Sequence, residues 1–394
     1  MDKLPKGWKG SIVDDVAIKI HYGYTGKTIE NGQYKYLRIT DIQNSAVVWE
    51  KVPFVSIADK DVKKYLLNEN DIVFARTGAT AGKSFLINSL NVNSVFASYL
   101  IRIIPNLDKI YPRFLYQYFQ TPGYWSYITS NVEGAAQPNF NGKKLANIPI
   151  PLPPLPEQKR IVSKLDALFE RIDQSIALLE ENIKHTEALM ASALDEVFGE
   201  IDQEKFLPLL EICSPSKETL IPIDNEEYNY VGLENIQSNT GRIINFSRTE
   251  GKNIKSTKVR FKRGAVLYGK LRPYLNKVYV ADFDGIATTE IMPFQTRKDL
   301  LNASFLAYFL RSPRFVALVN QYTSGARMPR ATTTFFKKVA KVPVIPLNSQ
   351  EKIVKKLDSY SKSIEGLLQE QKSKLNHLKS LKESILDKAF KGEL

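Results

Sequence analysis

The sequence is poor in the residues that carry redox chemistry, metal binding and much of catalysis. It holds one cysteine, Cys213, and three histidines, His21, His185 and His377, among 394 residues. A single cysteine excludes an intramolecular disulfide framework and suits a reducing cytosol. No Cys/His cluster has zinc spacing, and His185 and His377 lie at equivalent positions of a repeat, where solvated or interhelical roles are expected. We therefore expect no metal on this chain.

Other signatures are missing as well. No run reaches the ~18 apolar residues of a membrane span, and the first residues, MDKLPKGWKG, contain no apolar leader segment. We find no glycine-rich AdoMet loop and no Asn-Pro-Pro-aromatic tetrapeptide of an amino-methyltransferase. The Glu-x-Lys strings at Glu157 and Glu370 lie in helical segments without a partnered acidic strand, so a nuclease centre is not expected. These absences predict a non-catalytic, cytoplasmic protein without a cofactor of its own.

What the chain does have is length, a core and positive charge. With 43% hydrophobic residues it can form two or three ordered domains. Its net charge of +13 favours a polyanionic partner, although charge alone does not separate nucleic acid from an acidic membrane. Residues 157–200 carry five basic and ten acidic side chains, or −5, and residues 348–394 carry ten and seven, or +3. Subtracting both from +13 leaves +15 on the rest of the chain.

Much of the sequence occurs twice, about 192 residues apart. PLPPLPEQKRIVSKLDALF, at residues 151–169, matches VIPLNSQEKIVKKLDSY, at residues 344–360. SALDEVFGE, at residues 192–200, matches SILDKAFKGEL, at residues 384–394. One unit of roughly half the chain has therefore been duplicated, which suggests a target in two parts.

Both repeats contain a heptad pattern typical of a coiled coil. From Leu165, ten positions step by alternating fours and threes, and all are apolar except Thr186. The matching seam from Leu357 is apolar at seven of ten positions, with Ser361, Gln371 and Lys382 as its polar members. The predicted interface residues are Leu165, Ile172, Ile176, Leu179, Ile183, Leu357, Ile364, Leu368, Leu375, Leu378 and Ile385.

Local signals place the starts of these helices. Pro156 suits a first helical turn, and Asn348 or Ser349 can cap the second helix. A helix of ~40 residues is ~60 Å long and must bury its apolar stripe. The repeat is the obvious partner, because an internal two-fold would set the two helices antiparallel, with −5 facing +3. The alternative is that each helix packs only on its own domain.

The remaining halves alternate strand-like runs with turns. The first half predicts strands at 34–43, 70–87 and 98–105 and a helix at 113–119. The second half repeats these landmarks at 228–237, 264–280, 290–296 and 305–319. The sequences between the landmarks diverge, as expected if two copies of one framework contact different targets.

The first candidate loop is a glycine-containing stretch within the second predicted strand run, residues 70–87. GATAGKS, at residues 78–84, resembles a phosphate-binding P-loop but has three residues, not four, between the first glycine and the Gly-Lys pair. An NTPase site is therefore a minor alternative. Loops of this composition suit phosphate contact and base reading. The candidate DNA contacts are Arg76, Thr77, Thr80, Lys83 and Ser84, matched by Tyr268, Lys270, Arg272, Tyr274 and Lys277.

The second candidate loop is broken by proline in both halves. It reads EGAAQPNFNGKK at residues 133–144 and SGARMPRATTTFFKK at residues 324–338. Any single polar residue here could be an ordinary solvated loop residue, but the recurrence at equivalent places favours a shared role. The candidates are Gln137, Asn139 and Lys143, with Arg327, Arg330, Thr332 and Lys337.

The whole chain resembles the specificity subunit of a Type I restriction-modification system. The resemblance rests on LPEQKRIVSKLDAL, its echo NSQEKIVKKLDSY, the terminal ILDKAFKGEL and, more weakly, RTGATAGK. It implies an α+β fold in which two mixed α/β target recognition domains, related by a pseudo-two-fold, are separated by two long antiparallel coiled-coil helices. The implied segments are 1–156 and 204–347 for the domains, and 157–203 and 348–394 for the helices.

The resemblance also implies partners. The chain would bind double-stranded DNA with a bipartite, asymmetric site, with the helices as a ruler between half-sites about one to two turns of ~34 Å apart. Two methyltransferase subunits, which bind AdoMet, would dock near the helices, and restriction subunits, which use ATP and Mg, would join through them. The alternative function is a coiled-coil protein-interaction scaffold with non-specific DNA affinity.

Overall fold

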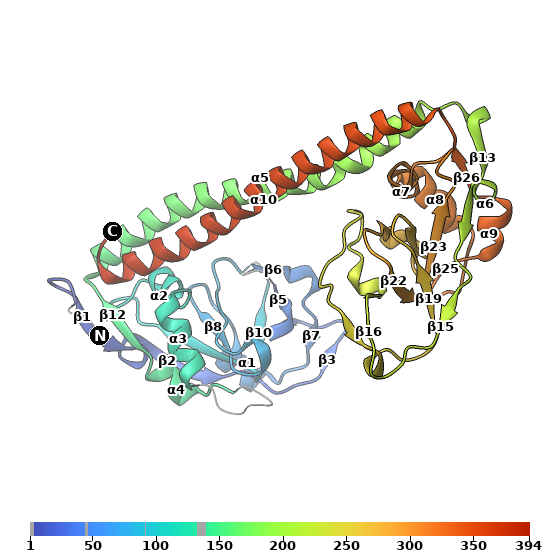
Figure 1. Cartoon of the computed structure of the whole chain (residues 1–394). Helices are drawn as coiled ribbons and strands as arrows, with labels where there is room; N and C mark the ends of the chain where they lie inside the picture. Colours follow the sequence, from blue (N-terminus) through green and yellow to red (C-terminus); the bar gives the residue numbers. More distant parts are fainter. Residues whose placement is uncertain (1–3, 44–45, 91, 132–138) are drawn as a thin grey trace. The chain divides into compact units, whose positions relative to one another are not determined.

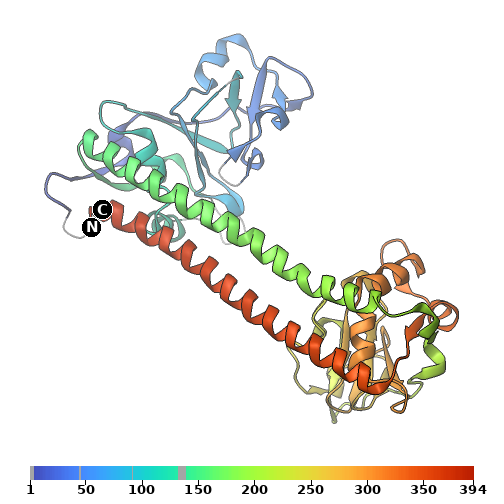
Figure 2. The same cartoon turned by 90° about the horizontal axis from the view of Figure 1, so that it is seen from above.

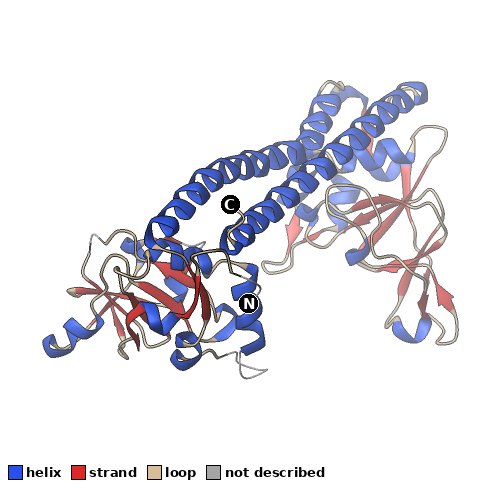
Figure 3. Ribbon diagram, turned by 90° about the vertical axis from the view of Figure 1, so that its left-hand side faces the viewer, coloured by secondary structure: helices blue, strands red, loops and turns tan. Residues whose placement is uncertain are grey.

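The computed structural model describes residues 4–43, 46–90, 92–131 and 139–394 (Figure 1). It divides into two compact units, residues 1–179 with 374–394, and residues 180–373. Each unit contains a mixed α/β body and a stretch of both long helices (Figure 3). The predicted α+β class, with two mixed α/β domains and two long helices, is confirmed in this respect.

The first unit is built on two four-stranded sheets. Its strands are β1 (Lys9–Ile12), β2 (Ala17–Tyr22), β3 (Thr28–Ile29), β4 (Tyr34–Leu37), β5 (Ile42–Gln43), β6 (Ala46–Val47), β7 (Phe54–Val55), β8 (Ile72–Ala75), β9 (Ser84–Leu86), β10 (Ser94–Phe96), β11 (Leu100–Pro105) and β12 (Pro149–Leu152). Its short helices are α1 (Asp59–Tyr65), α2 (Pro112–Tyr118), α3 (Pro122–Asn131) and α4 (Gly142–Ala146). The sheet orders are β2-β11-β8-β9 and β10-β4-β7-β3, and β1 pairs with β12.

The second unit repeats this plan. Its strands are β13 (Phe206–Pro208), β14 (Cys213–Pro215), β15 (Thr219–Leu220), β16 (Glu227–Tyr228), β17 (Tyr230–Val231), β18 (Thr249–Glu250), β19 (Lys258–Phe261), β20 (Val266–Gly269), β21 (Val278–Val280), β22 (Gly285–Thr288), β23 (Ile291–Thr296), β24 (Thr323–Ser324), β25 (Arg330–Ala331) and β26 (Lys341–Pro343). Its short helices are α6 (Leu209–Ile212), α7 (Ala303–Leu310), α8 (Pro313–Gln321) and α9 (Thr333–Lys338).

Strand order shows that the main sheets of the two units share one topology, whereas the smaller sheets differ, with the orders β10-β4-β7-β3 and β15-β19-β22-β17. The antiparallel sheet β14-β23-β20-β21 has the connectivity of β2-β11-β8-β9, and the pair β13-β26 corresponds to β1-β12. Each unit also has one parallel pair at the matching place, β10 with β4 and β22 with β17. The duplication inferred from the sequence therefore extends to the fold.

Several predicted elements are interrupted. The strand expected at 70–87 forms β8 and β9 around a turn, and the helix expected at 305–319 forms α7 and α8. The break follows from local chemistry, because Pro313 begins α8 and Ser312 caps it, accepting a hydrogen bond from the Phe315 backbone N–H. The strand expected at 34–43 likewise divides into β4, a 3₁₀ turn and β5.

In the first unit, an unusual polar group joins three strands of the main sheet. Arg102 of β11 is 4% exposed and forms an ion pair with Asp71 at 3.1 Å, just before β8. Its Nε donates to His21 Nε2 of β2 at 3.0 Å. Burial, and then the Arg102 charge, lower the pKa of His21 to about 4. The imidazole is therefore neutral at pH 7 and can accept that hydrogen bond.

The two long helices are α5 (Leu155–Gly199) and α10 (Leu347–Lys391), each of 45 residues (Figure 2). At 1.5 Å per residue each is ~67 Å long. The cap expected at Asn348 or Ser349 is wrong, because α10 already begins at Leu347. The carbonyl of Pro346 instead accepts hydrogen bonds from the N–H groups of Ser349 and Gln350.

The predicted seam lies on the less exposed face of both helices. All of its predicted interface residues are buried or half-buried: Leu165, Ile172, Ile176, Leu179, Ile183, Leu357, Ile364, Leu368, Leu375, Leu378 and Ile385. In the second unit, Leu194 and Val197 share a cluster with Leu357, and in the first unit Leu165 shares one with Ala389. These contacts require antiparallel helices and contradict the alternative in which each helix packs only on its own domain.

Three of the four polar residues in the seam, Thr186, Gln371 and Lys382, pair with one another or with the facing helix. Gln371 Nε2 donates to Thr186 Oγ1 at 3.1 Å in the second unit. In the first unit, Lys382 Nζ lies 2.6 Å from Asp173 and 4.9 Å from the ring centroid of Phe169. A polar pair inside an apolar seam fixes the register at some cost in stability. The opposite charges of the two helices are thus used in specific contacts.

Both long helices are anchored by an equivalent glutamine. Gln158 is fully buried; its Oε1 accepts from Tyr111 N at 2.7 Å, and its Nε2 donates to the carbonyls of Lys109 and Pro153. Gln350 is also fully buried and makes the same three bonds in the second unit, with Asn302 N, Leu300 O and Ile345 O. The motif shared by the two repeats therefore encodes a joint between helix and domain.

Candidate nucleic-acid interface

In the first unit, the described end of the second candidate loop, residues 139–144, pairs with the first candidate loop. The Phe140 N–H donates to the Arg76 carbonyl at 2.8 Å, and Thr77 pairs with Asn139 as an isolated antiparallel bridge. The Arg76 N–H donates to the Tyr99 carbonyl at 3.2 Å. The loop after β8 and the loop before α4 are therefore held together by backbone bonds, and their side chains can meet the same ligand.

The second unit has the same arrangement. The Ala331 N–H donates to the Lys270 carbonyl at 2.9 Å, and Leu271 pairs with Arg330. The Lys270 N–H donates to the Glu290 carbonyl at 2.8 Å. Arg76 thus corresponds to Lys270, Tyr99 to Glu290 and Asn139 to Arg330. One backbone frame carries a different set of side chains in each unit.

In the first unit this surface combines arginine, tyrosine and amide groups. The Arg76 guanidinium lies 4.9 Å from the ring centroid of Tyr22, whose hydroxyl accepts from the Gly142 N–H at 2.8 Å. Tyr99 is 60% exposed. Arg76 Nε and Asn139 Oδ1 are enclosed without a hydrogen-bond partner. Such unpaired atoms are costly in a free protein and are common where a ligand supplies the partner.

In the second unit the matching surface contains an ion pair. Arg330 Nε donates to the Glu290 carboxylate at 2.9 and 3.2 Å, and its Nη1 donates to the Met328 carbonyl at 3.3 Å. Arg330 remains half exposed, with 45% of its side chain accessible. The pair orients the guanidinium, and an oriented guanidinium suits bidentate contact with a guanine edge or a phosphate.

The turn after β20 holds an arginine in a strained backbone conformation. Arg272 has φ +50° and Asn276 has φ +52°, on either side of a one-turn 3₁₀ helix, Pro273–Leu275. Non-glycine residues rarely adopt this left-handed region, except asparagine. Arg272 is exposed and Tyr274 is 52% exposed. An arginine kept at an unfavourable position is consistent with a function in binding.

We predict opposite effects of Arg272→Gly on folding and on binding. Glycine adopts positive φ without strain, so we expect the free energy of unfolding to stay equal or rise by up to about 1 kcal/mol. DNA affinity should fall, because the exposed guanidinium is lost. Denaturant unfolding and duplex titration measure the two effects. Arg297→Gly, on an exposed segment of the same unit, is the control, and reduced stability of Arg272→Gly would show that the turn is not strained.

Most of the predicted contact residues are accessible. Lys83, Lys143, Arg272, Tyr274, Arg327, Arg330 and Lys337 are exposed, and Arg76, Thr77, Thr80, Asn139, Lys270 and Thr332 are half-buried. Gln137 lies outside the described residues. Thr332 already has a structural role, since its hydroxyl accepts from the Phe335 N–H and caps α9.

Two predicted contacts are contradicted by the structure. Tyr268 is 3% exposed and packs edge-on against Phe336, because strand β20 is buried on both faces. Ser84 is 8% exposed, and its hydroxyl accepts from Gln120 Nε2 at 3.1 Å. Neither side chain presents an accessible group to DNA. Lys277 is half-buried, and its Nζ already donates to the Leu233 carbonyl at 2.6 Å.

The resemblance to a P-loop does not extend to structure. A P-loop leads from a strand into a helix, whose N-terminus holds phosphate. Here the residues after Lys83 form strand β9. The minor alternative of an NTPase site at this loop is therefore wrong.

Sequence reasoning missed Tyr22, Tyr99 and Glu290. Tyr99 and Glu290 precede strands β11 and β23 and look like ordinary strand-flanking residues. Their place in the candidate site depends on backbone hydrogen bonds between residues distant in sequence. Tyr99 is bonded to Arg76, 23 positions earlier, and Glu290 to Lys270, 20 positions earlier. Tyr99 and Glu290 could have been identified as chemically different residues at equivalent positions of the repeat. Nothing in the sequence indicates Tyr22.

The described residues contain no cluster of three or more His, Cys, Asp or Glu side chains able to hold a metal ion. Among them, none of the helices has an apolar stretch sufficient to cross a bilayer.

Two basic units with matched loop pairs define a nucleic-acid-binding protein with two recognition domains. A family model described as the Type I restriction modification DNA specificity domain matches residues 5–184 and 209–377, and the chain belongs to this family. It is a Type I specificity subunit, and its two units are DNA recognition domains. The family predicted from the repeated helix motifs is thereby confirmed.

Similar proteins match along nearly the whole chain. The Escherichia coli Type I restriction enzyme EcoDI specificity subunit is 24% identical, covering 93% of this chain and 88% of its own. A putative Type I restriction enzyme MjaX specificity subunit of Methanocaldococcus jannaschii is also 24% identical, covering 100% and 95%.

Solved structures show the same fold. A chain from work on complex assembly and conformational transition of the type I R-M system aligns with a TM-score of 0.78 and 23% identity over 100% of both chains. The HsdS subunit from Thermoanaerobacter tengcongensis aligns with a TM-score of 0.59 and 22% identity, over 100% of this chain and 98% of that one.

Proposed function

We propose that each recognition domain reads one half of a bipartite, asymmetric DNA target. The observation that supports this is the shared loop frame with different side chains. Arg76, Tyr99 and Asn139 in one unit occupy the backbone positions of Lys270, Glu290 and Arg330 in the other. Arginine and lysine favour guanine, asparagine favours adenine and glutamate favours cytosine. Two domains with the same loop backbone but different side chains would recognise two different half-sites.

The long helices act as the spacer in this proposal. Each is a single helix of 45 residues that begins in one unit and ends in the other. The +15 charge outside the helical segments would neutralise phosphates and make affinity salt-dependent. The helices thereby determine how many unread base pairs separate the half-sites.

Two methyltransferase subunits and the restriction subunits would dock on the helices and perform the chemistry, so this chain would be non-catalytic. Each long helix carries exposed leucines outside the seam, including Leu178 at 62%, Leu189 at 48% and Leu381 at 48%. Exposed apolar side chains at helical spacing suit contact with further helices. AdoMet would be bound by the methyltransferase subunits, and ATP and Mg by the restriction subunits. This function places the complex at the chromosome, in the cytoplasm.

The direct test is selection from random duplexes by the chain assembled with its methyltransferase subunits, across a salt series. We expect a two-part consensus that methylation of host DNA reproduces. Binding without sequence preference would instead support the scaffold with non-specific DNA affinity.

We predict that removing one heptad from each long helix shortens the preferred spacer. Seven residues span ~10.5 Å of helix, which equals about three base pairs at ~34 Å per turn of DNA. The facing segments 173–179 and 378–384 can be deleted together, because both belong to the paired seam. Selected targets should keep their half-sites and lose about three unread base pairs. Deletion from α5 alone is the control and should disrupt pairing, whereas an unchanged spacer in the double deletion would refute the ruler.

A further inference from the structure

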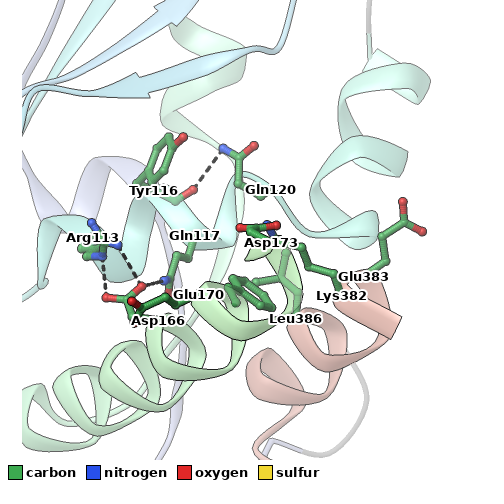
Figure 4. Close-up of a pocket in the computed structure, with 11 residues that line it drawn as sticks. Arg113, Tyr116, Gln117, Gln120, Asp166, Glu170, Asp173, Lys382, Glu383 and Leu386 are labelled. Carbon is green, nitrogen blue, oxygen red and sulfur yellow. Dashed lines mark hydrogen bonds and ion pairs between the residues drawn. The ribbon is translucent and has the colours of Figure 1, made fainter. Parts of the chain in front are cut away.

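The first unit contains a pocket of about 520 Å³ lined by α2, α5 and α10 (Figure 4). Its charged lining consists of Asp166, Glu170, Asp173, Glu383, Arg113 and Lys382. Arg113 is bound to Asp166 at 2.7 Å and Lys382 to Asp173 at 2.6 Å. Four carboxylates therefore face two cations, and the pocket keeps a negative charge after both pairs have formed.

Gln117 adds an unused acceptor to this lining. The residue is 6% exposed, and its Nε2 donates to Asp166 Oδ1 at 2.8 Å. Its Oε1 is enclosed without a hydrogen-bond partner. A carbonyl oxygen and carboxylates together favour a ligand that is cationic and carries several N–H groups.

The second unit shows what fills the equivalent place. In this segment the repeat is offset by 191 residues, so that Pro122 aligns with Pro313, Gln120 with Arg311 and Gln117 with Tyr308. Arg311 is 7% exposed, and its guanidinium carbon lies 4.5 Å from the ring centroid of Tyr308. The Tyr308 hydroxyl donates to Asp358, the counterpart of Asp166, at 2.6 Å. A guanidinium from within the chain occupies this site.

A second guanidinium of the same unit pairs with the adjacent helix carboxylate. Arg242 forms an ion pair with Glu365, the counterpart of Asp173. Gly241 lies against Arg311, since a Cβ added there would be 2.5 Å from Arg311 Nη1. The loop between Ile236 and Ile243 thus closes the second unit's site with an arginine of its own.

The described residues of the first unit show no such closure. The corresponding segment, residues 42–47, has the sequence IQNSAV, which is two residues shorter and contains no arginine or lysine. Asp166 and Asp173 are matched by Asp358 and Glu365 in the second unit, but the arginine-containing loop has no counterpart in sequence. The two copies therefore differ in whether the chain fills the site.

We propose that the pocket of the first unit binds an arginine side chain presented by a loop of a partner protein in the assembled complex, an inference that rests on the proposed function. The second unit's Arg311 and Arg242 show the chemistry of the occupant. A guanidinium presents five N–H donors in a planar fork, which matches carboxylate and amide oxygens better than an ammonium does. The two units would then contact their partner copies unequally.

The decisive variant is Gln120→Arg, which gives the first unit the residue that fills the second. Gln174→Arg is the matched control, because it adds the same charge to an exposed position of α5 outside the pocket. In calorimetric titration of the full chain with the methyltransferase subunit, we expect Gln120→Arg to weaken one of the two sites about tenfold or more, since a buried charge contact is lost. The control should bind as the wild type does.

A small-molecule probe tests the pocket without any partner. Argininamide should bind the full chain saturably, with a Kd in the millimolar range expected for one ion-paired contact, and lysinamide more weakly. Binding should vanish in Gln120→Arg. If that variant unfolds, Glu170→Gln, which removes a charge at an exposed position, should still weaken argininamide binding.

Two results would overturn the inference: partner affinity equal in Gln120→Arg and Gln174→Arg, or argininamide binding unchanged in Gln120→Arg and Glu170→Gln. Duplex selection reports on the proposed function separately. If the wild-type chain binds argininamide in the pocket but shows no preference among DNA sequences, the proposed DNA recognition is refuted. The inference about the ligand of the pocket would then still stand.

Discussion

Replacing Gln158 with leucine is expected to lower the free energy of unfolding of the first unit by about 3–5 kcal/mol. The side chain is fully buried and joins α5 to the domain through Tyr111 N, Lys109 O and Pro153 O. Leucine has similar volume but no polar atoms, so these three backbone groups would lose their buried partner. Each unpaired buried group costs about 1–3 kcal/mol.

Gln350→Leu provides a matched comparison, because its three bonds are the same in kind and lie in the second unit. Hydrogen exchange followed by mass spectrometry should locate each effect, with faster exchange in residues 1–179 for Gln158→Leu and in residues 180–373 for Gln350→Leu. Gln174→Leu, exposed on α5, should change neither unit. Exchange that rises equally in both units for either variant would show that the anchors are not local.

The long helices were predictable because their signal is both periodic and repeated. Ten positions at heptad spacing recur 192 residues later. They define the buried face of each helix and indicate the helix of the other repeat as its partner. The polar members of the seam could be read as weak points from the sequence alone. The structure shows that Thr186 and Gln371 face each other, which depends on an antiparallel register that no local pattern specifies.

The domains were less predictable, because their strands are short and their cores depend on contacts distant in sequence. The run at 70–87 reads as one strand, yet Asn70, with φ +72°, precedes β8, and Gly82, with φ +97°, lies in the turn between β8 and β9. Strand propensity identifies only the apolar residues at the two ends of this run. The position of the turn is determined by the pairing of β8 with β11, whose residues lie about 30 positions away in the sequence.

The structure brings the predicted loops together by backbone pairing, but it does not leave every predicted side chain accessible. Lys83 and Arg330 are exposed as expected, whereas Tyr268 is buried because strand β20 is covered on both faces. The sequence does not show which strands are covered in this way. Composition therefore identifies the surface, and only the backbone pairing decides which residues it presents.

Arg330→Ala is expected to reduce affinity for the selected duplex about 10- to 100-fold and to relax sequence preference in one half-site only. Arg330 is half exposed and held by Glu290, so its guanidinium is already fixed in one orientation. A good bidentate base contact is worth about 1–3 kcal/mol of discrimination. Arg76→Ala should have a similar effect on the other half-site, because Arg76 belongs to the first unit.

Removing Arg330 also releases the Glu290 carboxylate, which would repel phosphates and exaggerate the loss. The double variant Arg330→Ala with Glu290→Gln separates these effects, since it removes both charges. If Arg330 reads a base, the double variant recovers overall affinity but not sequence preference. Lys298→Ala, at an exposed position beyond β23, is the control for loss of charge and should lower affinity uniformly across sequences. Arg330→Ala behaving like Lys298→Ala would reduce Arg330 to a phosphate contact and shift base reading in this unit to Lys270 and Arg272.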